Sequence, residues 1–280
     1  MKSGQCVPST TLARSGLRVS RLALGLSRLH RMGGDRSRMA LIRAAREAGI
    51  THFDTAPLYG DGLSERVLGK AVRGCRDAVT IASKVGLLPR RWIGTLGTAA
   101  WPLHAGRAIL RRARLISWPR RSFSAATLRD SVASSLRALR TDYLDILFLH
   151  EPELREIEES DGLFEEMAKM KKAGAIRHAG VSGPILPEIM TRFGEIIDVV
   201  QTMESGWHEG SGVIPDLTFG ALGCATFQEG DARGNPVCAA LEHALARRPG
   251  GAVVVGTTKA EHLRDLVAVA SQREHALRLP

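Results

Sequence analysis

The sequence predicts a single α/β domain whose eight strands close into a (β/α)8 barrel of the TIM type. Short runs of Val, Ile and Leu alternate with longer amphipathic, charged stretches along the whole chain. Such runs are typical of parallel strands that are buried on both faces. The 280 residues also suit one barrel, which usually takes about 250 residues. We therefore expect one domain over residues 1–280, with an insertion at 88–123 after the third strand.

The position of the polar residues separates a closed barrel from an open sheet, which also alternates strands and helices. Polar residues or glycine stand at the C-terminal ends of many of the apolar runs, namely at Asp54, Lys84, His150, Ser182, Gln201 and Gly256. A barrel gathers all strand ends into one ring, whereas an open sheet spreads them along an edge. The barrel is therefore favoured.

The elements follow from these runs and from the turn residues between them. We expect strands at Arg21–Leu26, His52–Asp54, Val79–Lys84, Tyr143–His150, Arg177–Val181, Ile197–Thr202, Gly220–Ala225 and Ala252–Gly256. We expect helices at Ser37–Ala48, Ser64–Val72, Ala125–Leu139, Gly162–Ala173, Leu186–Phe193, Pro236–Arg247 and Lys259–Ala270. Ser64 and Ser124 are candidate N-caps, and Gly49 and Gly174 are candidate helix ends.

Three connecting segments have their own character. Thr10–Arg18 carries alternating Leu and polar residues around a Ser-Gly pair, which predicts a hairpin that plugs the N-terminal face of the barrel. Glu151–Glu159 is acidic and is expected to be a solvated loop. Glu204–Leu217 is too rich in Gly and Pro for a helix to be predicted there.

The net charge of +10 belongs to one segment of the chain. Between Ala78 and Arg129 there is no acidic residue but there are ten Lys and Arg residues, so the remainder of the chain is balanced. A nucleic-acid-binding domain usually spreads basic residues over a face, with aromatic residues among them. Nucleic acid is therefore not an expected partner.

The four cysteines are scattered, and no Cys/His cluster has metal-ligand spacing. We expect free thiols in a reducing compartment and no metal site. Met1–Gly16 has no apolar run of the kind that forms a signal peptide, so a cytoplasmic location is expected.

Four residues at or just after the ends of the second, third and fourth strands suggest acid catalysis. Asp54 needs a positive partner if it is buried, and Lys84 ends the next strand. Tyr59, in the loop after Asp54, becomes a better proton donor when an ammonium group stabilises its phenolate. His150 follows an apolar run and can hydrogen-bond a carbonyl oxygen. Each residue alone has an ordinary structural explanation, but the four together favour a catalytic site.

The chain resembles the aldo-keto reductases over almost its whole length. The resemblance lies in Gly49–Gly60 (GITHFDTAPLYG), Ser64-Glu65, Leu68-Gly69, Ser83–Gly86, Thr141–Asp145, His150, Ile176–Ser182 and Gly256–Leu263. It implies that Tyr59 is a general acid, that Lys84 lowers the pKa of Tyr59, that Asp54 anchors Lys84 and that His150 orients the carbonyl. It also implies a bound nicotinamide as the hydride donor.

The same resemblance implies the cofactor contacts. Ser182 and Gln201 match positions that hold the nicotinamide carboxamide, while Gly183 stands where Asn is usual and Glu204 where a stacking Tyr is usual. Trp207 could replace that aromatic surface or be an ordinary loop residue. Gly256, Thr257 and Thr258 precede a helix whose N-terminus suits a phosphate.

Two further positions concern the choice of cofactor. His262 stands where the family often has an Arg for the 2′-phosphate, and Leu266 where it has Asn or Gln. The choice between NADPH and NADH stays open, with NADPH favoured.

The segment between Lys84 and Ser124 is longer than a plain barrel connection. It contains three of the four tryptophans and a basic amphipathic stretch, Arg107–Ile116. Three interpretations compete: a substrate lid, a solvated loop without a partner, and an element that docks on a membrane surface or a protein.

We expect an NAD(P)H-dependent oxidoreductase that reduces a small aldehyde or ketone, or that runs in reverse. The alternative is a catalytically weak or inactive cofactor-binding barrel that acts as an interaction module through the basic insertion. The substrate, the direction of reaction and the oligomeric state are not predicted.

Overall fold

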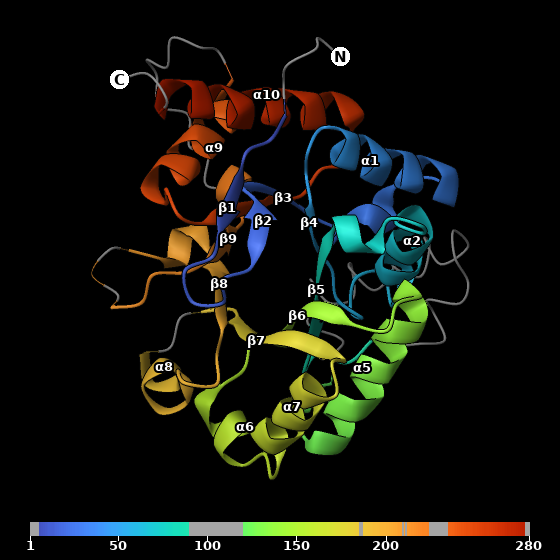
Figure 1. The fold of residues 1–280 in the computed structure, drawn as a ribbon, viewed down its shortest axis with the longest axis vertical. Coiled ribbons are helices and arrows are strands. Elements are labelled where there is room, and N and C mark those ends of the chain that lie inside the picture. The colour runs from blue at the N-terminus through green and yellow to red at the C-terminus, as the bar shows by residue number, and fades with distance from the viewer. Residues whose placement is uncertain are drawn as a thin grey trace, which may run out of the picture.

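The protein is a closed barrel of eight parallel strands with helices around it, as the sequence predicts. The computed structural model describes residues 6–89, 120–184, 187–208, 210, 212–223 and 235–277, with side chains up to residue 272. The strands close in the order β10-β3-β4-β5-β6-β7-β8-β9. Figure 1 shows the helices, from α1 to α10, surrounding these strands.

Seven of the eight barrel strands lie where the apolar runs predict them. The barrel strands are β3 (Leu22–Gly25), β4 (His52–Asp54), β5 (Thr80–Val85), β6 (Leu144–His150), β7 (Ile176–Ser182), β8 (Val199–Met203), β9 (Leu217–Phe219) and β10 (Ala252–Val255). The strand expected at Gly220–Ala225 was wrong, because β9 comes earlier. Leu217 pairs with both neighbouring strands, opposite Gln201 and Ala252, and Ala221–Gly223 forms a 3-10 turn instead.

The seven expected helices are all present. The helices are α1 (Asp35–Glu47), α2 (Leu63–Ala71), α5 (Ala125–Leu139), α6 (Leu154–Glu158), α7 (Leu163–Lys172), α8 (Pro187–Phe193), α9 (Pro236–Arg247) and α10 (Ala260–Leu277). Ser124 caps α5 by accepting a hydrogen bond from the backbone N–H of Thr127. Gly49 and Gly174 follow the ends of α1 and α7 with positive φ, as helix-ending glycines do.

Two local expectations were wrong. The acidic segment expected to be a loop contains α6, where Glu153 and Glu156 form a reciprocal capping box. Ser64 is not the N-cap of α2, because Gly62 takes that position in a left-handed conformation. The Ser64 hydroxyl instead donates to the carbonyl of Leu26, which joins α2 to the loop after β3.

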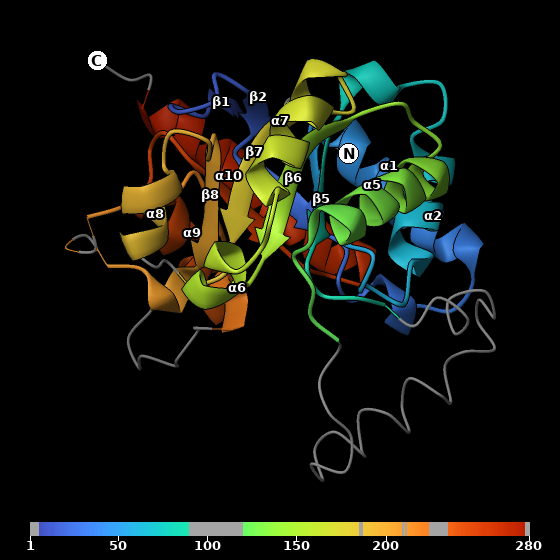
Figure 2. The same ribbon diagram turned by 90° about the horizontal axis from the view of Figure 1, so that it is seen from below.

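The N-terminal hairpin closes one end of the barrel, as expected. Strands β1 (Ser9–Thr11) and β2 (Arg18–Ser20) are antiparallel, and Figure 2 shows them at the end of the barrel opposite α6. Leu12 and Val19 are fully buried in one cluster with barrel-interior side chains such as Ile146 and Phe148. This plug leaves the opposite end of the barrel, where the strands end, for a site.

The basic insertion is described only at its two ends. Leu87 and Arg121 form an antiparallel bridge, and the backbone N–H of Ser122 donates to the carbonyl of Gly86 at 2.9 Å. The predicted helix at Arg107–Ile116 and the three interpretations of the insertion lie outside the described residues. No described helix is long and apolar enough to span a membrane.

Candidate active site

A cavity of about 530 Å³ opens at the C-terminal ends of the barrel strands. It is lined by Gly25, Ser27, Arg28, Asp54, Tyr59, Lys84, His150, Glu151, Ser182, Gln201, Phe219, Gly220, Leu222, Gly223, Val237, Val254, Val255, Gly256, Thr257, His262 and Leu266. All four predicted catalytic residues are in this set, and so are five of the six predicted cofactor residues. Thr258 lies half-buried in the turn before α10 and does not line the cavity.

Asp54 and Lys84 form a buried ion pair at the ends of β4 and β5. The Lys84 Nζ atom lies 2.6 Å from each Asp54 carboxylate oxygen, and the two side chains are only 2 % and 5 % exposed. Burial lowers the pKa of the Lys84 ammonium and is the largest single effect, but the Asp54 carboxylate and Tyr59 together outweigh it, so the pKa lies above its usual range. Lys84 therefore carries a full positive charge inside the cavity.

Tyr59 is held beside this charge by a tight loop before α2. Its backbone N–H donates to the carbonyl of Ala56, and the next three residues, Gly60 to Gly62, all have positive φ. The Lys84 Nζ atom lies 5.2 Å from the centre of the Tyr59 ring. Burial raises the pKa of the Tyr59 phenol and the charge of Lys84 lowers it, with burial the larger effect. Lys84 acts in the direction that the sequence analysis predicts, yet the phenol stays protonated at neutral pH.

His150 ends β6 with its ring set edge-on to Tyr59, the ring centres being 6.1 Å apart. Burial lowers the pKa of His150 to about 3, and the charges of Lys84 and Arg121 act in the same direction. The imidazole is therefore neutral at physiological pH and has one ring N–H to donate. Tyr59 and His150 thus present two hydrogen-bond donors to the same part of the cavity.

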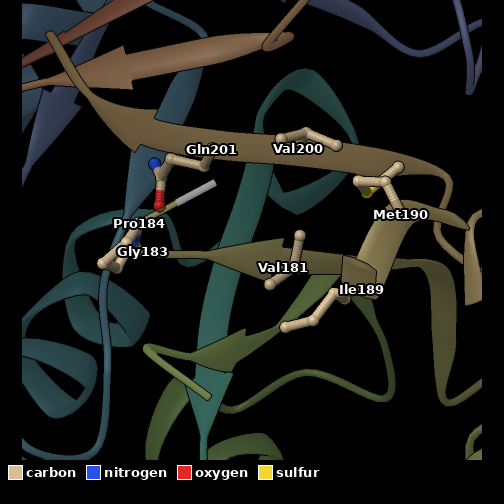
Figure 3. A pocket seen from close by; sticks show the side chains of 7 residues that line it. All are labelled: Val181, Gly183, Pro184, Ile189, Met190, Val200 and Gln201. Atoms are coloured by element: carbon tan, nitrogen blue, oxygen red, sulfur yellow. The ribbon is translucent and has the colours of Figure 1, made fainter. Parts of the chain in front are cut away.

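Ser182 and Gln201 connect the cofactor half of the site to the ion pair. The Ser182 hydroxyl donates to the Gln201 side-chain oxygen at 2.6 Å, and the Gln201 amide donates to Asp54 at 2.9 Å. Both side chains are buried. Next to them Gly183, Pro184 and Val200 help to line a separate cavity of about 10 Å³, and Figure 3 shows the Gln201 amide pointing toward Gly183 and Pro184.

Glu204 does not face the cavity, so it does not take the place of a stacking aromatic residue. It is buried behind β9, where it accepts hydrogen bonds from Thr218 and Arg247 and pairs closely with Arg248. Trp207 is also buried away from the cavity, with its indole N–H donating to the carbonyl of Val213 and its ring beside the guanidinium of Arg247.

Several lining residues were missed by the sequence analysis. Phe219, at the end of β9, lines the cavity and pairs in register with Val254 and Met203 on the neighbouring strands. Ser27 and Arg28 stand exposed at the loop after β3, and Glu151 follows His150. The signal for Phe219 was available as an aromatic residue at a strand end, but the strand itself was placed too late in the chain.

Comparison with known proteins finds relatives of this chain among oxidoreductases. The chain is 34 % identical over 180 residues to the aldo-keto reductase YhdN of Bacillus subtilis, covering 62 % of this chain and 46 % of that protein. It is 30 % identical over 203 residues to a D-threo-aldose 1-dehydrogenase of a Pseudomonas species, covering 69 % and 59 %. The matched part thus spans about half the length of these two relatives.

Solved structures match over nearly the whole chain. A putative aldo-keto reductase from Pseudomonas aeruginosa has a TM-score of 0.72 at 28 % identity, with 97 % of both chains covered. An aldo/keto reductase from Klebsiella pneumoniae in complex with NADP and acetate has a TM-score of 0.69 at 25 % identity, covering 97 % and 94 %. The model of the aldo/keto reductase family matches residues 21–202, so the chain belongs to that family.

Proposed function

We propose that this protein is an oxidoreductase that reduces an aldehyde or ketone to an alcohol with a nicotinamide cofactor, or catalyses the reverse reaction. The observation that carries the proposal is the buried Asp54–Lys84 pair beside a protonated Tyr59 and a neutral His150 in one cavity. A charged lysine buried in this way is costly and has no evident packing purpose, so a catalytic use explains it best.

The cavity fits a nicotinamide cofactor by the chemistry of its donors. Ser182 and Gln201 offer a hydroxyl and a primary amide for a carboxamide group, and Phe219 offers an aromatic face in the same cavity for the pyridine ring. Farther along the cavity, Thr257 and His262 stand at the start of α10. The backbone N–H groups at a helix N-terminus suit a phosphate.

The protein's own groups would handle the proton. When bound, the cofactor supplies a hydride to the carbonyl carbon. Tyr59 donates its phenolic proton to the carbonyl oxygen, and Lys84 stabilises the phenolate that remains. Asp54 holds Lys84 in place, and the neutral His150 donates a hydrogen bond that orients the carbonyl oxygen.

We propose NADPH rather than NADH as the preferred cofactor. His262 lines the cavity in the first turn of α10 and can donate a ring N–H to a 2′-phosphate. The Klebsiella relative was solved with NADP. The named activity of the Pseudomonas relative, an aldose dehydrogenase, supports a small hydroxylated aldehyde or its oxidised counterpart as the substrate class.

The test is NADPH oxidation with a panel of aldehydes, comparing the wild type with Tyr59→Phe. We expect turnover in the wild type and a loss of roughly 10²- to 10⁴-fold in Tyr59→Phe, the usual contribution of a positioned acid. The matched control is Tyr143→Phe, which changes the only other tyrosine of the chain. Tyr143 donates to Asp77 and packs between the guanidinium groups of Arg76 and Arg177, away from the cavity.

Three outcomes would contradict the proposal. Equal losses in both tyrosine variants would show that the Tyr59 hydroxyl has no special role. Undiminished turnover in Tyr59→Phe would assign proton transfer to another group. Tight NADPH binding without turnover of any carbonyl compound would favour a cofactor-binding module over an enzyme.

A further inference from the structure

Glu151 is held in a strained conformation directly beside the candidate proton donors. It follows His150, and its φ of 51° is left-handed, which a non-glycine residue adopts only when its surroundings impose it. Its backbone N–H donates to the carbonyl of Ser182 at 2.6 Å, and its carbonyl accepts from Arg121 at 2.6 Å. Arg121 is fixed in turn by a two-point ion pair with Glu156, at 2.7 and 2.5 Å. These hydrogen bonds hold the Glu151 backbone in its left-handed conformation.

The conformation places the Glu151 side chain in the cavity wall, in space that a neighbouring side chain would otherwise occupy. A Cβ atom added to Gly183 would lie 2.9 Å from the Glu151 Cα atom and 3.2 Å from its Cγ atom. The Glu151 side chain can therefore occupy this space only because residue 183 is glycine. In effect, a carboxylate stands in the region where a side chain of residue 183 would be.

No described residue forms a hydrogen bond or ion pair with the Glu151 carboxylate, which lies in an exposed side chain lining the cavity. Its charge nevertheless reaches the catalytic group, because it raises the pKa of Tyr59. The cavity therefore contains an acceptor that neither the ion pair nor the Ser182–Gln201 pair uses.

The chemistry of a carboxylate defines what it can bind. An ionised carboxylate only accepts hydrogen bonds, so it attracts hydroxyl or ammonium groups and repels another carboxylate. The surroundings decide between the two attracted groups. Lys84 and Arg121 are already paired with Asp54 and Glu156. Arg28 lines the cavity with a positive charge that repels an ammonium group, which leaves a neutral hydroxyl as the better partner.

We propose that Glu151 is a specificity-determining residue that accepts a hydrogen bond from a hydroxyl on the carbon next to the substrate carbonyl, and that it thereby selects hydroxyaldehydes over simple aldehydes and over oxoacids. The inference rests on the proposed function, in which Tyr59 and His150 hold the carbonyl oxygen. His150 and Glu151 both line the cavity, which puts the Glu151 carboxylate in the same space as a substrate held there.

The test compares glyceraldehyde with propanal, which has the same three carbons but no hydroxyl groups. In Glu151→Met, which removes the acceptor at similar length, kcat/KM for glyceraldehyde should fall about tenfold or more, as expected for the loss of a hydrogen bond to an ionised group. The glyceraldehyde-to-propanal ratio of kcat/KM should therefore fall about tenfold, because any effect of the lost charge on Tyr59 applies to both aldehydes, and turnover of propanal shows that the variant is folded. In Glu151→Gln, turnover of glyoxylate, an anionic aldehyde, should rise because the repelling charge is gone.

The matched control is Glu153→Gln, two residues along the chain. Glu153 is exposed, lies 3.9 Å from the same Arg121 and does not line the cavity. Its glyceraldehyde-to-propanal ratio should equal that of the wild type. An unchanged ratio in Glu151→Met, with both aldehydes turned over, would overturn this inference and leave the proposed function standing. Failure of the wild type to reduce any aldehyde would overturn the proposed function and the inference with it.

Discussion

Gly183 is the position where the smallest possible substitution should have a large effect. Its φ is +152°, in the region that side-chain-bearing residues avoid, and an added Cβ would lie 2.9 Å from the Glu151 Cα atom. The backbone cannot easily move, because the Gly183 N–H donates to Gln201 at 3.0 Å and its carbonyl accepts from Thr202 at 2.8 Å. Backbone strain of about 1–3 kcal/mol and overpacking of about 1–3 kcal/mol together predict that Gly183→Ala lowers the free energy of unfolding by about 2–6 kcal/mol.

The control for this prediction is Gly74→Ala, which separates the two contributions. Gly74 also has a positive φ, +81°, but an added Cβ would meet nothing within 4 Å. Its substitution should cost only the backbone part, about 1–2 kcal/mol. Urea unfolding of both variants gives the comparison, provided that the slope m is unchanged. Because Gly183 follows Ser182, we also expect Gly183→Ala to raise the Kd for NADPH, measured by fluorescence, whereas Gly74→Ala should not. Equal destabilisation in the two variants, with equal NADPH affinity, would refute the steric argument.

Two further predictions concern buried titratable groups. Lys84→Met leaves the Asp54 carboxylate buried without its cation and should destabilise the protein by about 3–5 kcal/mol in urea unfolding. Carbonyl reduction should also be lost. A variant as stable and as active as the wild type would contradict the role of the Asp54–Lys84 pair. His52 is fully buried, with its Nδ1 atom 2.8 Å from the Thr80 hydroxyl, and burial lowers its pKa to about 4 from 6.5. Because the unfolded state binds this proton first, the contribution of His52 to stability should fall as the pH drops from 6.5 toward 4, by about 1.4 kcal/mol per pH unit and about 3 kcal/mol in all, in addition to the contribution of His150. The slope of unfolding free energy against pH should be smaller by one proton in His52→Asn, and identical slopes would show that His52 is not the acid-sensitive group.

The barrel was predictable because its evidence is local. Seven strands are visible in the sequence as apolar runs. The helices between them are indicated by capping residues and by the glycines that end them. The exception, β9, has only three residues, Leu217–Phe219, too few to show a period. Its strand character comes from pairing with β8 and β10, which are contacts that a local pattern does not contain. The nearby run Gly220–Ala225 is more apolar overall, so the pattern favoured the wrong segment.

The grouping of the four candidate catalytic residues was also predictable, because all four stand at or just after strand ends, which a barrel gathers at one end. Other residues that line the cavity, such as Glu151, were not predictable. Glu151 lies in a segment whose composition indicates a solvated loop, and only its left-handed backbone and its contacts with Ser182 and Arg121 bring its side chain to the cavity. A single φ angle thus decides whether this acidic residue is solvent-facing or part of the site. Sequence composition carries no information on that angle for a glutamate.

Glu204 stands in the sequence where the family usually has a stacking Tyr, but its side chain does not reach the cavity. Side chains alternate along β8, so Gln201 and Met203 share one side, but β8 ends at Met203 and Glu204 begins the 3-10 turn that follows, where the alternation no longer holds. Glu204 pairs with Arg248 and Thr218 behind the barrel, where a buried carboxylate needs such partners. Glu204 therefore connects the end of β8 to the end of α9 and has no contact with the cavity in which a nicotinamide ring would bind. If the cofactor pocket has an aromatic wall, the alternation of β9 places it at Phe219, because Thr218 faces outward to Glu204 and the next side chain must face inward.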